Sequence, residues 1–208
     1  MLDLKKFFYL HINVSFKTSL MNYLTCSLFN QEEIKILKTN LDSNNDSWED
    51  GKKTAGSFAS KVKHNLQLNR NSSISKKHTD FVVKKILTNS LIKSFALPKN
   101  IHGVMFTKSL NGMQYGRHID NSFMSSGRAD LSFTIFLNNK KDYEGGNLVI
   151  ETINNENKFK LDQGEIIIYP STYLLSVEKI TSGERLVCVG WIESYVKSIE
   201  EREYLFDI

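Results

Sequence analysis

The chain has 208 residues, of which 24% are charged, and 27 Lys and Arg against 23 Asp and Glu give a net charge of +4. This length is sufficient for one sizeable core and short for two ordinary domains. The basic residues form no dense run and no apolar stretch reaches bilayer length, so neither nucleic acid nor a membrane is an expected partner.

The first half of the chain predicts helices and loops. We expect residues 1–20 to be a dispensable N-terminal extension and residues 21–208 to form one domain. Asn30 and Glu33 have the spacing of a capping box, and apolar residues then recur at helical spacing, which predicts a helix over 30–42. Residues 42–75 read as loops with one strand near 62–68, and a second helix is predicted over 75–91. Cys26 and Cys188 are far apart and fit a reducing, cytoplasmic setting.

From residue 101 onward, short β-branched and aromatic runs alternate with Gly, Asn and Asp turns, which is typical of a sandwich or barrel. The predicted strands are 102–108, 113–119, 130–138, 146–153, 157–161, 164–169, 173–179 and 185–193. Eight strands suit a jelly roll. We therefore expect a mainly β fold with flanking helices (α+β), a double-stranded β-helix of the cupin or jelly-roll kind.

His118 and Asp120 are two residues apart, which on an extended strand places both side chains on one face. One imidazole and one carboxylate are two members of the facial triad that holds non-haem Fe(II). An isolated His-x-Asp is a weak signal, because it occurs often by chance and a surface or loop histidine is then the more usual explanation.

Arg185 enters an apolar strand, where a buried guanidinium requires an anionic partner. Its planar fork suits the distal carboxylate of a dicarboxylate ligand. The alternative is an ion pair with a neighbouring acid at the sheet edge.

An ordered series of motifs adds to these two features. It comprises Trp48 and residues 54–56, 62–68, 95–98, 112–121, 130–132, 143–146, 169–171, 182–185 and 191–194. Through this series the chain resembles the PKHD-type hydroxylases, relatives of prolyl 4-hydroxylases in the Fe(II)/2-oxoglutarate oxygenase superfamily.

The resemblance implies a dioxygenase that decarboxylates 2-oxoglutarate to succinate and hydroxylates a C–H bond. It assigns His118 and Asp120 to Fe(II), as the catalytic pair, and Arg185 and Tyr115 to 2-oxoglutarate. Ascorbate is expected as an accessory reductant, and a peptide or a small molecule as the substrate. A homo-oligomer is left open.

Two positions depart from the family pattern. Leu175 stands where the second iron-binding His belongs, and Ser109 stands where a Tyr is usual. Tyr173 and Val177 share the inward parity of Leu175, whereas Ser176 and Glu178 alternate away from it, so only a bulge or a register slip would turn them inward. His11, His64, His78 and His102 are assigned structural or surface roles, with His64 the most pocket-like.

Three functions remain open from the sequence. The first is an oxygenase weakened by Leu175, and the second is a degenerate domain that keeps the 2-oxoglutarate pocket without turnover. The third is a metal-free jelly roll that binds sugar or peptide. Residues 42–60 and 121–129 are expected to line the pocket, but they carry no motif that names a substrate.

Overall fold

The computed structural model describes residues 23–42, 47–152 and 155–208, so the expected extension at 1–20 lies outside the described residues. The elements in chain order are β1 (Leu24–Ser27), α1 (Gln31–Asp42), β2 (Trp48–Asp50), the 3-10 helix η2 (Gly51–Thr54), α2 (Ala59–Val62), β3 (Lys63–His64), β4 (Leu66–Leu68), α3 (Ser73–Thr88), α4 (Ser90–Ala96), β5 (Pro98–Ser109), β6 (Gln114–His118), β7 (Phe123–Met124), β8 (Gly127–Arg128), β9 (Leu131–Phe136), β10 (Tyr143–Gly145), β11 (Leu148–Glu151), β12 (Glu156–Phe159), β13 (Glu165–Pro170), β14 (Leu174–Val177), β15 (Ile180–Gly183), β16 (Arg185–Ser194) and α5 (Ile199–Asp207).

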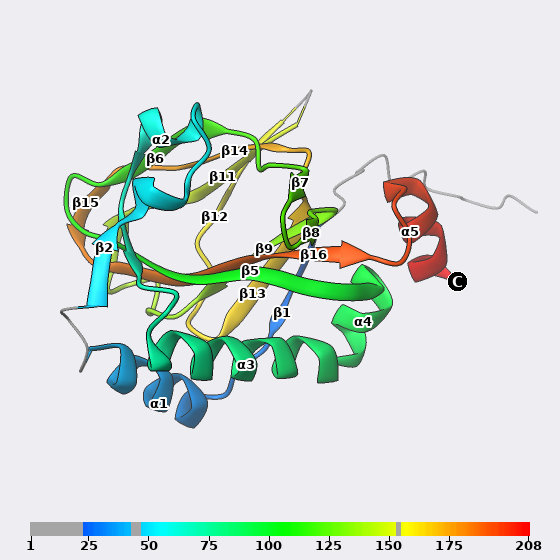
Figure 1. Cartoon of the computed structure of the whole chain (residues 1–208), viewed down its shortest axis with the longest axis horizontal. Coiled ribbons are helices and arrows are strands. Elements are labelled where there is room, and N and C mark those ends of the chain that lie inside the picture. The colour runs from blue at the N-terminus through cyan, green and yellow to red at the C-terminus, as the bar shows by residue number, and fades with distance from the viewer. Residues whose placement is uncertain (1–22, 43–46, 153–154) are drawn as a thin grey trace, which may run out of the picture.

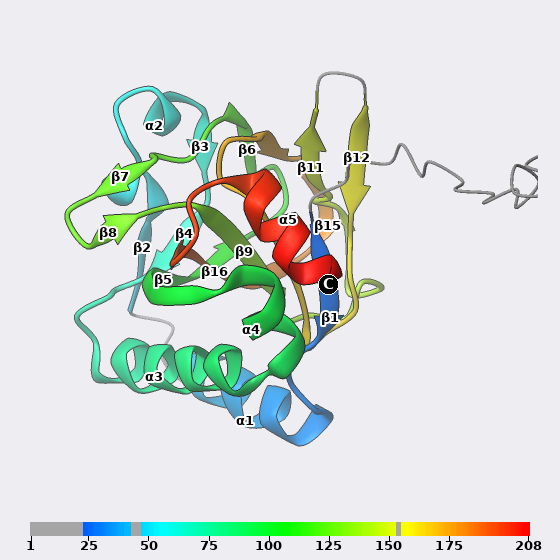
Figure 2. The same ribbon diagram turned by 90° about the vertical axis from the view of Figure 1, so that its right-hand side faces the viewer.

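Two antiparallel sheets form the body of the domain. The larger has the order β1-β13-β9-β16-β5-β4-β2, and the smaller has the order β12-β11-β14-β6-β3. Figures 1 and 2 show the smaller sheet above the larger one, with α1 and α3 below. Each of the eight predicted strands has its counterpart, and the predicted jelly roll with flanking helices is confirmed.

Helices α1, α3 and α4 cover the outer face of the larger sheet because their buried apolar residues pack with those of its strands. In α1, Ile34, Leu37 and Leu41 are buried, as the helical spacing predicted. The capping box also forms: the Asn30 amide donates to Glu33 Oε2 at 3.0 Å, and the Glu33 amide donates to Asn30 Oδ1 at 2.9 Å.

The period of two along the central strands separates the helix-facing core from the space between the sheets. In β16, Leu186 and Cys188 pack in the helix-facing core, whereas Val187 packs with Leu175 in the core between the sheets. Arg185 has the parity of Val187, so the same alternation turns it inward. The inward face of β16 therefore contributes both an apolar residue to the core between the sheets and the charged side chain of Arg185 to the cavity.

The prediction of the second helix over 75–91 is wrong at its C-terminal end. Helix α3 ends at Thr88, and Asn89 separates it from α4, an element that the prediction missed. The Asn89 amide donates to the carbonyls of Lys85 and Ile86, while its side chain accepts a hydrogen bond from the Ile92 amide at 3.0 Å. One asparagine therefore closes one helix and caps the next.

The single strand predicted near 62–68 is two strands in different sheets. β3 pairs with β6 in the smaller sheet, whereas β4 pairs with β5 in the larger one. The chain crosses between the sheets at Asn65. This crossing places residues 63–65 at the side of the space that the sheets enclose.

The prediction also missed the short strands β1, β2, β7, β8, β10 and β15, and the helix α5. Runs of two to four residues are too short to show a period, and their pairing comes from the strands beside them. Within the described ranges, no helix has the length and apolar character needed to cross a membrane. Both cysteines are free thiols.

Candidate active site

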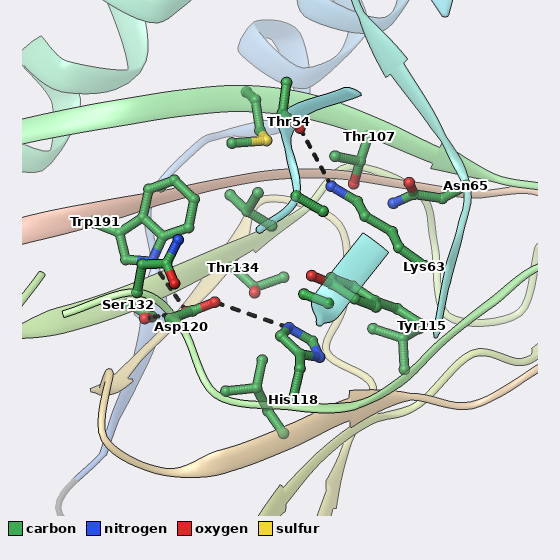
Figure 3. A pocket seen from close by; sticks show the side chains of 18 of the residues that line it. Thr54, Lys63, Asn65, Thr107, Tyr115, His118, Asp120, Ser132, Thr134 and Trp191 are labelled. Atoms are coloured by element: carbon green, nitrogen blue, oxygen red, sulfur yellow. Dashed lines mark hydrogen bonds and ion pairs between the residues drawn. The ribbon is translucent and has the colours of Figure 1, made fainter. Parts of the chain in front are cut away.

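A cavity of about 350 Å³ lies between the two sheets. Its walls come from β3, β5, β6, β9, β14 and β16, and segments around Thr54 and Asn121 border it, as expected for the loops at 42–60 and 121–129. His118, Asp120, Arg185, Tyr115, Leu175 and Ser109 all line this one cavity. The structure thus brings together every predicted site residue, and Figure 3 shows His118, Asp120 and Tyr115 among them.

His118 and Asp120 face each other in the cavity, with His118 Nε2 3.8 Å from Asp120 Oδ1. Strand β6 ends at His118, so Asp120 is not on the strand, contrary to the prediction of one extended segment. Ile119, between them, is 55% exposed and points away. The two side chains still converge because the alternation of inward and outward side chains continues past the end of β6.

Neighbouring groups hold the pair so that one nitrogen and one oxygen remain available. The His118 Nδ1 lies 2.8 Å from the Gly116 carbonyl, which fixes Nδ1 as the donor and leaves the Nε2 lone pair facing Asp120. Burial lowers the pKa of His118, which favours the neutral ring that a metal requires.

Asp120 Oδ2 accepts hydrogen bonds from Ser132 Oγ at 2.6 Å and from Trp191 Nε1 at 3.0 Å. These two donors fix the carboxylate, and its Oδ1 is the atom that faces His118. Partners of this kind orient metal ligands and tune their affinity.

Leu175 occupies the third position. It lies directly opposite His118 in the β14·β6 ladder, is 5% exposed and lines the cavity. Its neighbours give no replacement, because Ser176 does not line the cavity, and Glu178 binds Lys158 and Asn147. Among the described residues, no group of three or more His, Cys, Asp or Glu side chains is positioned to hold a metal.

The β14·β6 ladder does contain an irregularity. Leu175 pairs with His118 and Val177 pairs with Tyr115, so β6 carries one extra residue there. This bulge lies on β6, and Val177 keeps the inward parity of Leu175 and lines the cavity. The irregularity therefore does not turn Ser176 or Glu178 inward.

Arg185 is 4% exposed and begins β16 opposite Ser109 of β5. In the described part of the chain no acid pairs with it: the adjacent Glu184 instead lies 3.5 Å from Lys108. Its Nε is buried without a hydrogen-bond partner, and another N–H of the guanidinium donates to the neutral hydroxyl of Tyr143. The alternative of an ion pair at the sheet edge is therefore wrong.

The guanidinium is enclosed by aromatic side chains. Its Cζ lies 5.5 Å from the ring centre of Phe136. Gly146, at φ +65°, leaves room beside it, because a Cβ there would lie 3.1 Å from Arg185 Cδ and 2.3 Å from Ile180 Cδ1. A buried cation with an unused N–H and no acid is a site for an anionic ligand.

Tyr115 stacks on His118, with ring centres 3.6 Å apart and planes at 14°. Burial, and then the charge of Asp120, raise the pKa of Tyr115, so its phenol stays protonated. The ring forms a wall of the cavity beside the imidazole.

Two buried residues of the cavity wall were missed by the sequence reasoning. Lys63 and Asn65 are 6% and 8% exposed and line the cavity, whereas His64, which was expected to be the most pocket-like histidine, is exposed. Lys63 and Asn65 are two positions apart in an extended segment, so both point to the side opposite His64; this spacing was the signal in the sequence.

Comparisons with known proteins agree with this architecture. Residues 104–193 match the model of the 2OG-Fe(II) oxygenase superfamily. A Pseudomonas putida prolyl-4-hydroxylase has the same fold, with a TM-score of 0.59 at 15% identity over 84% of this chain and 94% of that one. A Trichoplax adhaerens prolyl hydroxylase, solved in complex with a hypoxia inducible factor peptide fragment, gives a TM-score of 0.59 at 14% identity over 89% and 87%. The fold and the family match define an Fe(II)/2-oxoglutarate-dependent oxygenase.

Closer relatives narrow the class. A PKHD-type hydroxylase of Prochlorococcus marinus strain MIT 9515 is 74% identical over 188 residues, which is 90% of this chain and 85% of the relative. Those of strains AS9601 and NATL1A are 71% and 56% identical over the same shares. The chain belongs to the PKHD-type hydroxylase family.

Proposed function

We propose that this PKHD-type hydroxylase holds Fe(II) with two protein ligands, His118 Nε2 and Asp120 Oδ1, and binds 2-oxoglutarate through Arg185. The observation that carries the proposal is the oriented pair at 3.8 Å with the hydrocarbon Leu175 opposite His118. Two of the three donors of a facial triad are present, so the site fits iron with a reduced affinity.

The structure also supports the site for 2-oxoglutarate. Arg185 lines the cavity that contains His118 and Asp120, and no acid of the described residues pairs with it to compete with a carboxylate. We assign Tyr115 to the same cosubstrate, as a neutral phenol beside the metal pair. Ser109 lies opposite Arg185 and replaces the usual Tyr with a shorter hydroxyl.

When bound, iron and 2-oxoglutarate supply the oxidising chemistry of the family, and the protein supplies position and enclosure. Ser132 and Trp191 hold the carboxylate of Asp120, the Gly116 carbonyl holds the imidazole, and Tyr115 covers one face of the imidazole ring. Leu175 and Val177 exclude water from the side where a third ligand would stand.

Leu175 favours a second candidate, a domain that binds 2-oxoglutarate without turnover. Both candidates bind 2-oxoglutarate through Arg185. They differ in whether iron held by His118 and Asp120 supports turnover. The test is calorimetric titration of 2-oxoglutarate into protein loaded anaerobically with Fe(II), together with succinate formation after oxygen is admitted.

For a weakened oxygenase we expect binding and succinate release that both depend on added Fe(II), with ascorbate raising the number of turnovers. Binding without succinate at saturating Fe(II) would establish the second candidate. Absence of 2-oxoglutarate binding would refute both.

A further inference from the structure

The cavity contains a second buried cation whose role the proposed function does not explain. Lys63, on β3, is 6% exposed and extends its side chain into the cavity over the ring of Tyr115, with Nζ 5.3 Å from the ring centre. In Figure 3 it enters beside Thr54 and Asn65, whereas His118 and Asp120 lie at another side of the same space.

The ammonium of Lys63 is poorly satisfied. Its one hydrogen bond goes to Thr54 Oγ1 at 3.4 Å, and that hydroxyl lies 2.5 Å from Gln67 Oε1, to which it donates. No carboxylate of the described residues forms an ion pair with it. An ammonium has three donors, so at least two face the cavity or its wall without a protein acceptor.

The charges that line the cavity are also unbalanced. Three cations, Lys63, Arg70 and Arg185, stand against the single carboxylate of Asp120. A 2-oxoglutarate dianion and a divalent iron cancel each other's formal charge, so the loaded site would still carry an excess of positive charge from its side chains. Such a cavity favours an anionic substrate.

Lys63 and Arg185 come from different sheets. Arg185 begins β16 of the larger sheet, and Lys63 belongs to β3 at the edge of the smaller one. Arg185 lies in an aromatic enclosure, whereas Lys63 lies among hydroxyl and amide side chains. The cavity therefore has a buried cation on each of the two sheets.

We propose that Lys63 binds a carboxylate of the primary substrate, with Thr54 positioning the ammonium of Lys63 and the side-chain N–H of Asn65 available to the bound group. The substrate class is therefore an acid, either a small carboxylic acid or a peptide that presents its C-terminal carboxylate. This inference rests on the proposed function, because it takes Arg185 to be occupied by 2-oxoglutarate.

The test uses matched pairs that differ only in charge: acetate and acetamide, benzoate and benzamide, N-acetylproline and its amide, and a Gly-Pro-Gly peptide with a free or an amidated C-terminus. Binding to the full chain is measured by ligand-observed NMR with the 2-oxoglutarate site saturated. Lys63→Met removes the charge and keeps the length, and Lys63→Arg keeps the charge. Lys61→Met is the matched control, since Lys61 is a nearby exposed lysine that does not line the cavity.

We expect at least one acid to bind at least tenfold more tightly than its amide. Lys63→Met should abolish the difference, Lys63→Arg should retain part of it, and Lys61→Met should leave it unchanged. A preference confined to the peptide pair identifies a peptide substrate, and a preference within the small pairs identifies a small acid.

The proposal is overturned if no acid in the set is preferred, if none binds, or if Lys63→Met keeps the preference. It is also overturned if Lys63→Met weakens 2-oxoglutarate binding tenfold, because Lys63 would then belong to the cosubstrate site. An Arg185→Ala variant with unchanged 2-oxoglutarate affinity would instead refute the proposed function, so the two failures are distinguishable.

Discussion

Replacing Leu175 with histidine should restore a third metal ligand, because position 175 is 5% exposed, lines the cavity and lies opposite His118. The change roughly conserves side-chain volume. Without metal, the new imidazole has buried polar atoms without partners, which costs about 1–3 kcal/mol of unfolding free energy. A domain of this size loses about 2–4 °C of Tm per kcal/mol, so the metal-free variant should melt several degrees lower.

Metal should reverse this loss. A third ligand should raise Fe(II) affinity by at least about tenfold, since even partners outside the ligand set change affinity by about 10–100-fold. At a free metal concentration 100 times Kd, binding stabilises the folded state by about 2.7 kcal/mol, comparable with the cost of the substitution. Succinate release that depends on 2-oxoglutarate should rise in parallel.

The assays are anaerobic Fe(II) titration, thermal melting with and without Fe(II), and succinate measurement. Leu174→His is the matched control, because Leu174 precedes Leu175 on β14 and does not line the cavity. It should gain neither affinity nor turnover. If the unchanged protein binds Fe(II) and turns over as well as Leu175→His, the reasoning fails and another group completes the metal site.

Four further expectations follow. Arg185→Ala should weaken 2-oxoglutarate binding at least tenfold in calorimetry, because a charge-assisted pair contributes about 1.5–3 kcal/mol; equal affinity would remove Arg185 from the site. Burial lowers the pKa of Lys63 to about 8 from 10.5, so unfolding free energy should rise between about pH 8 and 10.5, by at most about 3 kcal/mol. In denaturant titrations, Lys63→Met should abolish this rise of unfolding free energy with pH. An unchanged rise in the variant would show that Lys63 is not its source. Trp191→Phe should lower Fe(II) affinity about 10–100-fold by removing the N–H that holds Asp120, whereas unchanged affinity would show that the bond is dispensable. A chain that begins at Met21 should melt cooperatively, and insolubility would show that residues 1–20 are needed.

The sign of the Lys63 effect follows from proton binding. Between the two pKa values the unfolded chain holds the lysine proton and the folded chain has released it, so raising the pH favours folding. Below about pH 8 both states are protonated, and the cost of the buried charge is fully present. Arg70 adds to the lowering of this pKa, whereas Asp120 and Asp50 oppose it.

Strong periodic patterns were the predictable part of the fold. The strands of the second half were found because β-branched and aromatic runs alternate there with Gly, Asn and Asp turns. Helix α1 was found because the capping box at Asn30 and Glu33 and the helical spacing of Ile34, Leu37 and Leu41 indicate the same helix. What failed depends on single residues or on pairing: Asn89 separates two helices with one side chain, and β10 pairs only with β15 through residues distant in sequence.

The candidate site was likewise predicted in part from the sequence and in part only seen in the structure. The resemblance to the family predicted that His118, Asp120, Arg185 and Leu175 belong to one site, and all four line one cavity. The sequence did not reveal that β6 ends at His118, one residue short of the predicted strand end at 119. The family position also indicated His64 as the most pocket-like histidine, whereas the alternation along β3 buries Lys63 and exposes His64.

The most direct test of the two-ligand iron site is the number of imidazoles bound to the metal. X-ray absorption of the full chain, loaded anaerobically with Fe(II) and 2-oxoglutarate, counts them. The account predicts one imidazole in the unchanged protein, none in His118→Ala and two in Leu175→His. Two imidazoles in the unchanged protein, or one that survives His118→Ala, would contradict it.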